Sequence, residues 1–151
     1  MQYVIIIFSI VSIDQIVKFF IEKNIKLYES IPIISNILYF THVHNKGAAF
    51  SILWNQRIFF LILSSITFVI MFFLIFFTNI EVKYKYSICI ILSGALGNFI
   101  DRLFKGYVID FIDFRIWPIF NVADIFISIG SILMIILFIT ERRDKELVNR
   151  K

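Results

Sequence analysis

The stretch Ile58–Phe77, with the sequence IFFLILSSITFVIMFFLIFF, contains 20 residues and carries no charged side chain. An α-helix needs about 20 mostly apolar residues to cross the hydrocarbon core of a bilayer. In lipid, the backbone hydrogen bonds must be satisfied within the segment, which a helix achieves and an open strand does not. This stretch therefore predicts a membrane-spanning helix.

The composition of the whole chain agrees with a membrane location. Hydrophobic residues make up 60% of the 151 residues, and Phe alone occurs 19 times. Soluble domains contain only roughly 45–50% apolar residues. We therefore expect an integral membrane protein that forms one domain over residues 1–151. Its net charge of +4 comes largely from short flanking segments, which does not favour a nucleic-acid partner.

Three further apolar stretches have the length of membrane spans. They cover about residues 3–21, 84–104 and 120–140. Together with residues 58–77 they predict an all-α integral membrane protein with four transmembrane helices. Four spans place both termini on one side of the membrane. Lys and Arg residues in the C-terminal tail and in the loop between the second and third spans favour the cytoplasmic side for both termini.

Two connections remain between the spans. Residues 24–56 are numerous enough to hold structure, and residues 38–44 have weak strand character. A small extracytoplasmic strand-containing segment is therefore expected between the first and second spans. Residues 105–119 are rich in aromatic side chains and are expected to form a return loop, with Trp117 at the membrane interface.

Four aspartates lie in or beside the apolar stretches, namely Asp14, Asp101, Asp110 and Asp124. Ionisable side chains at membrane depth are costly and are usually retained for function. At about 1.5 Å per helical residue, Asp101 lies roughly 24 Å from Lys85, Asp124 roughly 25 Å from Glu141, and Asp14 roughly 20 Å from residue 1. Asp110 falls in the return connection. All four are therefore expected near one face of the membrane.

Two of the aspartates belong to a doubled phrase. The copies are Asn98-Phe99-Ile100-Asp101 and Asn121-Val122-Ala123-Asp124. Residues three apart share one face of a helix. Taken alone, the doubled phrase pairs Asp101 with Asp124.

The residues around these polar groups favour close packing. Gly94 and Gly97 precede Asp101 at helical spacing, and small residues allow helices to approach closely in lipid. Asp14 and Lys18 are four residues apart, so they can pair and offset part of each other's desolvation cost.

A pair of carboxylates in such a place can perform acid–base chemistry. Two carboxylates held close in a poorly solvated site cannot both ionise easily, which leaves one acid and one base. The pair can then deprotonate a water and protonate a carbonyl oxygen or a leaving amine. The chain contains neither Gly-x-Ser-x-Gly nor His-Glu-x-x-His. His42 and His44 would share a strand face but lack a third ligand, so no metal site is expected.

Other interpretations of the same residues remain open. A structural interpretation assigns an ion pair to Asp14 and Lys18, a helix-end anchor to Asp101 and Arg102, interhelical hydrogen bonds to Asn98 and Asn121, and dipole stabilisation to Asp124. A small ion or proton transporter would use similar residues, but it should place them at successive depths. A non-catalytic assembly factor would tolerate the loss of either carboxylate.

At these residues the chain resembles the lipoprotein signal peptidase family, also called signal peptidase II. The resemblance spans most of the chain, and the family's phrases occur in the family's order. They are Asp14-Gln15-Ile16-Val17-Lys18, Asn45-Lys46-Gly47-Ala48-Ala49-Phe50-Ser51, Gly94-Ala95-Leu96-Gly97-Asn98-Phe99-Ile100-Asp101-Arg102, Val108-Ile109-Asp110-Phe111 and Phe120-Asn121-Val122-Ala123-Asp124. Ser93 departs from the family pattern, since many members have a second glycine there.

The resemblance implies a membrane aspartic endopeptidase that removes signal peptides from prolipoproteins. Such enzymes cleave on the N-terminal side of the diacylglyceryl-modified cysteine and need no cofactor. By resemblance the catalytic pair is Asp110 and Asp124, so Asp110 replaces Asp101 as the partner of Asp124. The residues that the resemblance assigns to positioning the substrate and the pair are Asp14, Lys18, Asn45, Gly47, Asn98, Asp101, Arg102 and Asn121.

The resemblance also implies a location and partners. The protein is expected in the bacterial cytoplasmic (inner) membrane, with its active site near the outer face. Its expected partners are diacylglyceryl-modified prolipoproteins and membrane lipids, and we expect a monomer.

Overall fold

The computed structural model of the chain describes residues 1–47 and 57–148. Residues 48–51, which end the second family-like phrase, lie outside the described residues. Four long helices dominate the described part: α1 (Gln2–Asn24), α2 (Arg57–Phe77), α3 (Val82–Phe104) and α4 (Val122–Val148). Each is long and apolar enough to cross a membrane, which confirms the four predicted spans. The end of α4 lies beyond the predicted residue 140.

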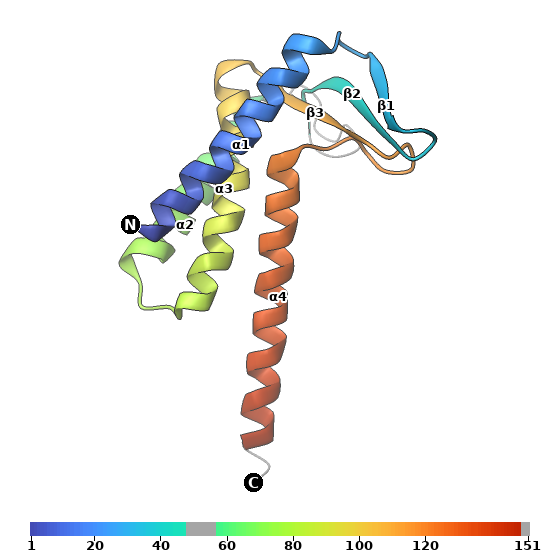
Figure 1. Cartoon of the computed structure of the whole chain (residues 1–151). Helices are drawn as coiled ribbons and strands as arrows, with labels where there is room; N and C mark the ends of the chain where they lie inside the picture. The colour runs from blue at the N-terminus through green and yellow to red at the C-terminus, as the bar shows by residue number, and fades with distance from the viewer. Residues whose placement is uncertain (48–56, 149–151) are drawn as a thin grey trace.

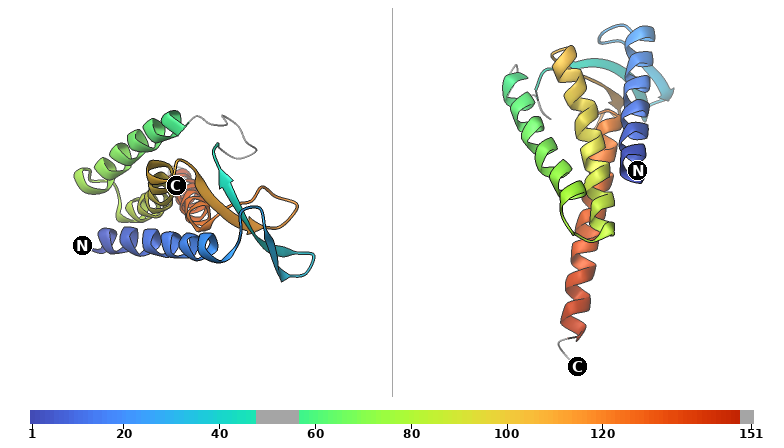
Figure 2. Two further views of the ribbon diagram at one scale, coloured as in Figure 1. Left: turned by 90° about the horizontal axis from the view of Figure 1, so that it is seen from above. Right: turned by 90° about the vertical axis from the view of Figure 1, so that its left-hand side faces the viewer.

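Helix α3 occupies the centre of the bundle. Helices α1, α2 and α4 each pack against it, and Figure 2 shows them arranged around it. Half of the α3 span (50%) is buried inside the protein, against 6% for α2, so most of the apolar surface of α2 is left for lipid. The core between α2 and α3 consists of Ile75, Ile88, Cys89 and Leu92.

Glycines on α3 bring α1 and α4 close to it, as the sequence predicted. A Cβ added at Gly97 would lie 2.5 Å from the Asp14 carboxylate and 3.4 Å from the Cβ of Ala123. A Cβ added at Gly94 would meet the backbone of Ala123. The start of α4 and the polar side of α1 therefore meet on this small-residue face of α3.

A small antiparallel sheet lies beside one end of the bundle (Figure 1). It contains β1 (Ser30–Ile34), β2 (Leu38–Asn45) and β3 (Val108–Asp113), in the order β1-β2-β3. Strand β2 confirms the strand expected at residues 38–44. The expectation of a simple return loop at residues 105–119 was wrong, because β3 lies within it and completes the sheet.

Strand β3 joins the sheet to the helices. Its residues Ile109 and Phe111 form a core cluster with Ile21 and Ile25 at the end of α1. Figure 1 shows the sheet beside the last turns of α1 and α3 and the first turn of α4, while both chain ends point away from it. The fold thus gathers three helix ends and one strand at a single end of the bundle. That the 151 residues form one domain stays a prediction.

Candidate active site

The N-terminus of α4 is capped by Asn121. Its Oδ1 accepts a hydrogen bond from the backbone N–H of Asp124 (3.0 Å), and the Asp124 carboxylate accepts one from the backbone N–H of Asn121 (3.3 Å). This reciprocal pair is a capping box, which satisfies two N–H groups that a helix start otherwise leaves without partners. The cap holds the half-buried Asp124 carboxylate in the first turn, where the helix dipole favours negative charge.

Asp110 reaches the same place from β3, where it pairs with Val43 of β2. Its side chain is buried; Oδ1 accepts a hydrogen bond from Nδ2 of Asn121 (2.6 Å), and Oδ2 accepts one from Nδ2 of Asn45 (2.8 Å). Burial, and after it the negative charge of Asp124, raises the pKa of Asp110 to about 7 despite these hydrogen bonds. Below about pH 7 the Asp110 carboxyl therefore keeps its proton.

Asn98 connects both acids to α1. Its Nδ2 donates to Oδ1 of Asp124 (2.8 Å), and its Oδ1 accepts hydrogen bonds from Nδ2 of Asn121 (3.1 Å) and from Nζ of Lys18 (2.9 Å). Because Asn121 also donates to Asp110, one continuous network joins the two acids. The doubled phrase thus pairs Asn98 with Asp124, and not Asp101 with Asp124.

Lys18 lies at the centre of a buried ion network. Its Nζ is 2.8 Å from Oδ2 of Asp14 and 2.9 Å from Oδ2 of Asp101, and these three side chains are at most 1% exposed. With Asn98, the ammonium has three acceptors for its three N–H groups. Charges are buried only when they are paired and hydrogen-bonded in this way. The predicted Asp14–Lys18 pair is present, and Asp101 completes it.

Arg102 and Gly47 border the same region. The Arg102 guanidinium donates a hydrogen bond to the carbonyl of Gly47 (3.3 Å) and lies over the ring of Phe60, 4.8 Å from its centroid. The backbone N–H of Gly47 donates to Oδ1 of Asn45 (2.9 Å). Arg102 on α3 is therefore tied to the chain that follows β2.

A cavity of about 390 Å³ opens over the two acids. Its polar lining consists of Asn45, Asn98, Arg102, Asp110 and Asp124. Its apolar lining consists of Val108, Trp117, Pro118, Ile119, Phe120 and Ile127. A polar floor beside an apolar wall suits a peptide group that is attached to an apolar chain.

A second hollow of about 290 Å³ continues from this cavity along α4. The two share Trp117, Phe120 and Asp124, and the second extends over Ile125, Ser128, Ile129 and Ile132. Ile129 and Ile132 are exposed on the surface of the helix. The cavity with the acids is thus continuous with a surface of α4 that would face lipid.

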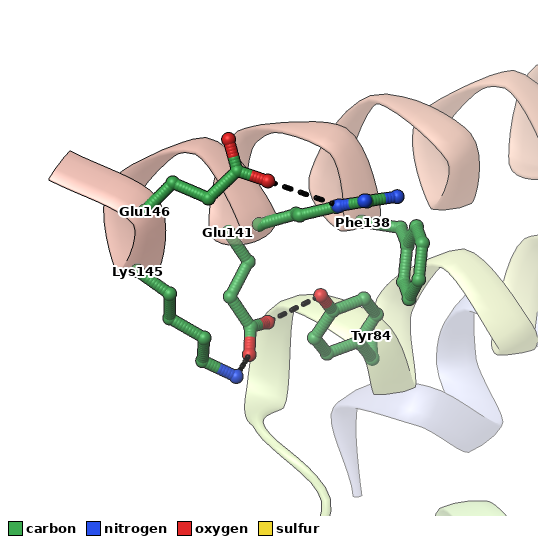
Figure 3. A pocket seen from close by; sticks show the side chains of 6 residues that line it. Tyr84, Phe138, Glu141, Lys145 and Glu146 are labelled. Carbon is green, nitrogen blue, oxygen red and sulfur yellow. Dashed lines mark hydrogen bonds and ion pairs between the residues drawn. The ribbon is translucent and has the colours of Figure 1, made fainter. Parts of the chain in front are cut away.

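A third hollow, of about 440 Å³, lies at the opposite end of α4 (Figure 3). There Glu141 accepts hydrogen bonds from the hydroxyl of Tyr84 (2.5 Å) and from Nζ of Lys145 (2.6 Å), and Arg142 pairs with Glu146 (3.2 Å). Each of these charged groups already has a partner, and none belongs to the network around the aspartates. We therefore assign the site to the cavity over Asp110 and Asp124.

The two histidines lie apart from that cavity. The rings of His42 and His44 are 4.9 Å apart, Nδ1 of His42 is 2.8 Å from the carbonyl oxygen of Ile25, and His44 stacks on Tyr107. Within residues 1–47 and 57–148, no group of three or more His, Cys, Asp or Glu residues is placed to hold a metal ion.

The structure adds one residue that the sequence analysis did not single out. The side chain of Gln15 donates hydrogen bonds to the carboxylates of Asp14 (3.2 Å) and Asp101 (3.4 Å) and to the carbonyl of Gly97 (3.1 Å). The ten residues that sequence reasoning did single out all lie in or directly around the network: Asp14, Lys18, Asn45, Gly47, Asn98, Asp101, Arg102, Asp110, Asn121 and Asp124. A signal for Gln15 was available in its position beside Asp14 and three residues before Lys18, on the same helix face.

Comparisons with known proteins agree with this arrangement. The model of the signal peptidase (SPase) II family matches residues 6–140. A lipoprotein signal peptidase of Halothermothrix orenii is 42% identical over 134 residues, covering 87% of this chain and 91% of the relative. A lipoprotein signal peptidase of Caldicellulosiruptor bescii is 39% identical over 156 residues, covering 100% of this chain and 99% of the relative.

A solved structure shares the fold. A bacterial membrane enzyme determined by the in meso method at 2.3 Å resolution has a TM-score of 0.89 and 35% sequence identity, covering 95% of this chain and 91% of the solved one. These matches confirm the predicted fold class and favour a peptidase over the transporter and the assembly factor. The chain is a multi-pass membrane protein and belongs to the signal peptidase II family of peptidases.

Proposed function

We propose that Asp110 and Asp124 are the catalytic pair with which this signal peptidase removes signal peptides from prolipoproteins. The observation that carries the proposal is that a buried carboxyl from β3 and a half-buried carboxylate from α4 line one cavity. The raised pKa of Asp110 supports a pair that holds a single proton near neutral pH.

The two acids then have different roles in hydrolysis. The ionised Asp124 accepts a proton from a water, whose oxygen forms a bond to the carbonyl carbon of the scissile peptide. The protonated Asp110 donates its proton to the carbonyl oxygen, which stabilises the tetrahedral intermediate. When that intermediate collapses, the carbon–nitrogen bond breaks and the leaving amine takes the proton held by Asp124. Asp110 regains its proton from the hydroxyl, so the carbonyl is restored and the pair returns to its starting state.

The substrate follows from the family and from the shape of the site. The scissile bond lies on the N-terminal side of the diacylglyceryl-modified cysteine. The apolar signal helix of the prolipoprotein lies along α4 in the hollow over Ile129 and Ile132, and its lipid stays in the bilayer. The surrounding polar residues position the substrate and the pair: Asp14, Lys18, Asn45, Gly47, Asn98, Asp101, Arg102 and Asn121.

The same proposal includes a location. The protein lies in the bacterial cytoplasmic membrane as a monomer, with both termini in the cytoplasm and the sheet at the outer face. Single cysteines introduced at Lys26 and at Lys145 test this orientation, with Cys89 replaced by Ala. A membrane-impermeant thiol reagent applied to intact cells should label the first position and not the second; the reverse result would contradict the orientation.

The catalytic assignment is tested by replacing each acid separately. Asp110→Asn and Asp124→Asn should each lower prolipoprotein cleavage in proteoliposomes by about 1,000-fold or more, since each removes a proton-transfer group. A matched control is Asp113→Asn on the same strand, whose buried carboxylate bonds to Thr41 (2.7 Å) and to the backbone of Arg115 (2.8 Å). Asp113→Asn should cleave at nearly the normal rate. Near-normal cleavage by either Asp110→Asn or Asp124→Asn would exclude the proposed pair.

A further inference from the structure

The residue before each proposed catalytic acid is held in the same way. Ala123, which precedes Asp124, donates its backbone N–H to Oδ1 of Asp14 (2.9 Å). Ile109, which precedes Asp110, donates its backbone N–H to Oδ2 of Asp101 (3.4 Å). Ala123 and Ile109 are both fully buried, so no bulk water competes for these N–H groups. One carboxylate therefore supports the start of α4, and another supports the start of β3.

The two supporting carboxylates are joined to each other twice. Lys18 bridges Asp14 and Asp101 through Nζ, at 2.8 and 2.9 Å. Gln15 bridges the same two carboxylates through Nε2, at 3.2 and 3.4 Å, and also donates to the carbonyl of Gly97 (3.1 Å). Gln15 and Lys18 are three residues apart on α1, so one face of this helix carries both bridges.

We infer that Gln15 is a positioning residue for peptide cleavage, which acts with Lys18 to fix the separation of Asp110 and Asp124 through the main chain before each of them. This inference rests on the proposed catalytic pair. Gln15 touches neither acid itself and does not line the cavity. Its effect must pass through Asp14 to Ala123 on one side and through Asp101 to Ile109 on the other.

The separation of the two acids matters because their charges interact. The negative charge of Asp124 helps to keep the proton on Asp110, while Lys18 acts in the opposite direction, and Arg102 also interacts with both acids. The energy of two charges falls as their separation grows. If the main chain before either acid loosens, Asp110 should lose its proton at a lower pH and the water should be held less well for attack.

The test is Gln15→Met, which keeps the length of the side chain and removes the amide. The full-length variant is reconstituted in proteoliposomes and assayed with a diacylglyceryl-modified prolipoprotein. We expect kcat to fall about 10-fold because reacting groups are misplaced by a fraction of an ångström. We expect KM to change little and the alkaline limb of the pH–kcat profile to move to lower pH.

A matched control is Tyr84→Phe, which removes one side-chain hydrogen bond to Glu141 at the opposite end of the bundle (Figure 3). Its thermal stability is measured beside that of Gln15→Met. Tyr84→Phe should leave kcat and the pH profile unchanged, even if both variants unfold at a lower temperature than the wild type.

The outcomes separate this inference from the proposed function. A Gln15→Met enzyme with wild-type kcat and pH profile, or one whose only change is a lower unfolding temperature, would overturn the inference while Asp110→Asn and Asp124→Asn remain inactive. If those two variants were active, the catalytic pair itself would be wrong, whatever Gln15→Met showed. A lower kcat with a shifted alkaline limb supports Gln15 as a positioning residue.

Discussion

The two ends of the helical bundle hold their charged side chains in opposite ways. At the sheet end, Lys18 pairs with Asp14 on the same helix and with Asp101 on α3, and all three side chains are at most 1% exposed. At the other end, Lys145 pairs with Glu141 one turn away on the same helix and is 72% exposed. Both ends contain ion pairs with similar distances, but only the first removes its charges from water.

This difference shows where the protein needs fixed geometry. Exposed pairs gain little, because water and salt screen them and flexible side chains lose entropy on pairing. Burying an ion pair costs desolvation free energy. This cost is offset only when the remaining donors and acceptors of the pair are hydrogen-bonded. At the sheet end, such pairs fix the positions of β3 and α4 relative to each other. At the other end, the exposed groups only connect α4 to the start of α3.

The largest effect is expected from Lys18→Met, which breaks the buried network. It leaves the buried Asp14 and Asp101 carboxylates without their cation. Removing one partner of a buried ion pair typically costs about 3–5 kcal/mol. Denaturant unfolding in detergent measures this loss, and cleavage should be abolished.

Lys145→Met at the other end is the matched control for Lys18→Met. It removes the same charge from an exposed pair, so it should cost no more than about 1 kcal/mol. Equal destabilisation by the two variants would contradict the contrast between the ends.

A smaller effect is expected from Gly97→Ala on α3. The added Cβ would lie 2.5 Å from Oδ2 and 3.1 Å from Cγ of Asp14, so the helices must separate. Overpacking of this kind costs about 1–3 kcal/mol. Because Asp14 supports the residue before Asp124, we also expect a fall in kcat, measured in the cleavage assay.

Gly130→Ala provides the comparison for Gly97→Ala. Its added Cβ would lie 2.7 Å from the side chain of Ile91, between α4 and α3 and away from the aspartates. It should lower stability by a similar amount and leave the pH profile of cleavage unchanged. A shifted profile in Gly130→Ala would show that any loosening of α4 disturbs the pair.

The helices and one strand could be predicted from the sequence, and another strand could not. The four spans follow directly from apolar length, because a membrane requires helices of about 20 residues. Strand β2 could be found from the alternating residues before Asn45. Strand β3 could not, because four of its residues in a row are buried and aspartate is uncommon in strands, so no alternation marks it.

The sequence predicted which residues form the site, but it did not predict which of them contact each other. Helical rise placed Asp14, Asp101 and Asp124 at one end, where the connection with Asp110 also lies. Spacing within α1 predicted the Asp14–Lys18 pair. No local spacing links Asp110 to Asp124, since sheet pairing with Val43 brings Asp110 to the start of α4. Periodicity therefore favoured Asp101, whose carboxylate instead bonds to Lys18 and Gln15. Only the family resemblance pointed to Asp110.

The buried Asp110 should also give stability a specific dependence on pH. Its pKa is raised to about 7 in the folded protein, so folding favours the protonated form. The resulting stabilisation is complete below the ordinary pKa of about 4 and is lost as the pH rises to about 7, by at most about 1.4 kcal/mol per pH unit. Asp110→Asn cannot ionise and should lack this loss.

The measurement is the difference in unfolding temperature between wild type and Asp110→Asn across this range. The wild type should lose stability relative to the variant as the pH rises from about 4 to about 7, and the difference should then become constant. Asp113→Asn, with a buried carboxylate on the same strand, shows whether the effect is specific to Asp110. A difference that does not depend on pH would contradict the protonated state assigned to Asp110.

The smallest effect is expected from Glu141→Gln at the exposed end. Glu141 pairs with Lys145 at 2.6 Å, lies 3.7 Å from Lys83 and accepts a hydrogen bond from Tyr84. Since both lysines are exposed, the loss of these pairs should lower stability only slightly, and the effect should shrink further in high salt. Unfolding at low and high salt measures the cost. Cleavage should be unchanged, because Glu141 does not support the main chain before Asp110 or before Asp124. A fall in kcat would show that α4 transmits strain along its whole length, and the two ends would then no longer be independent.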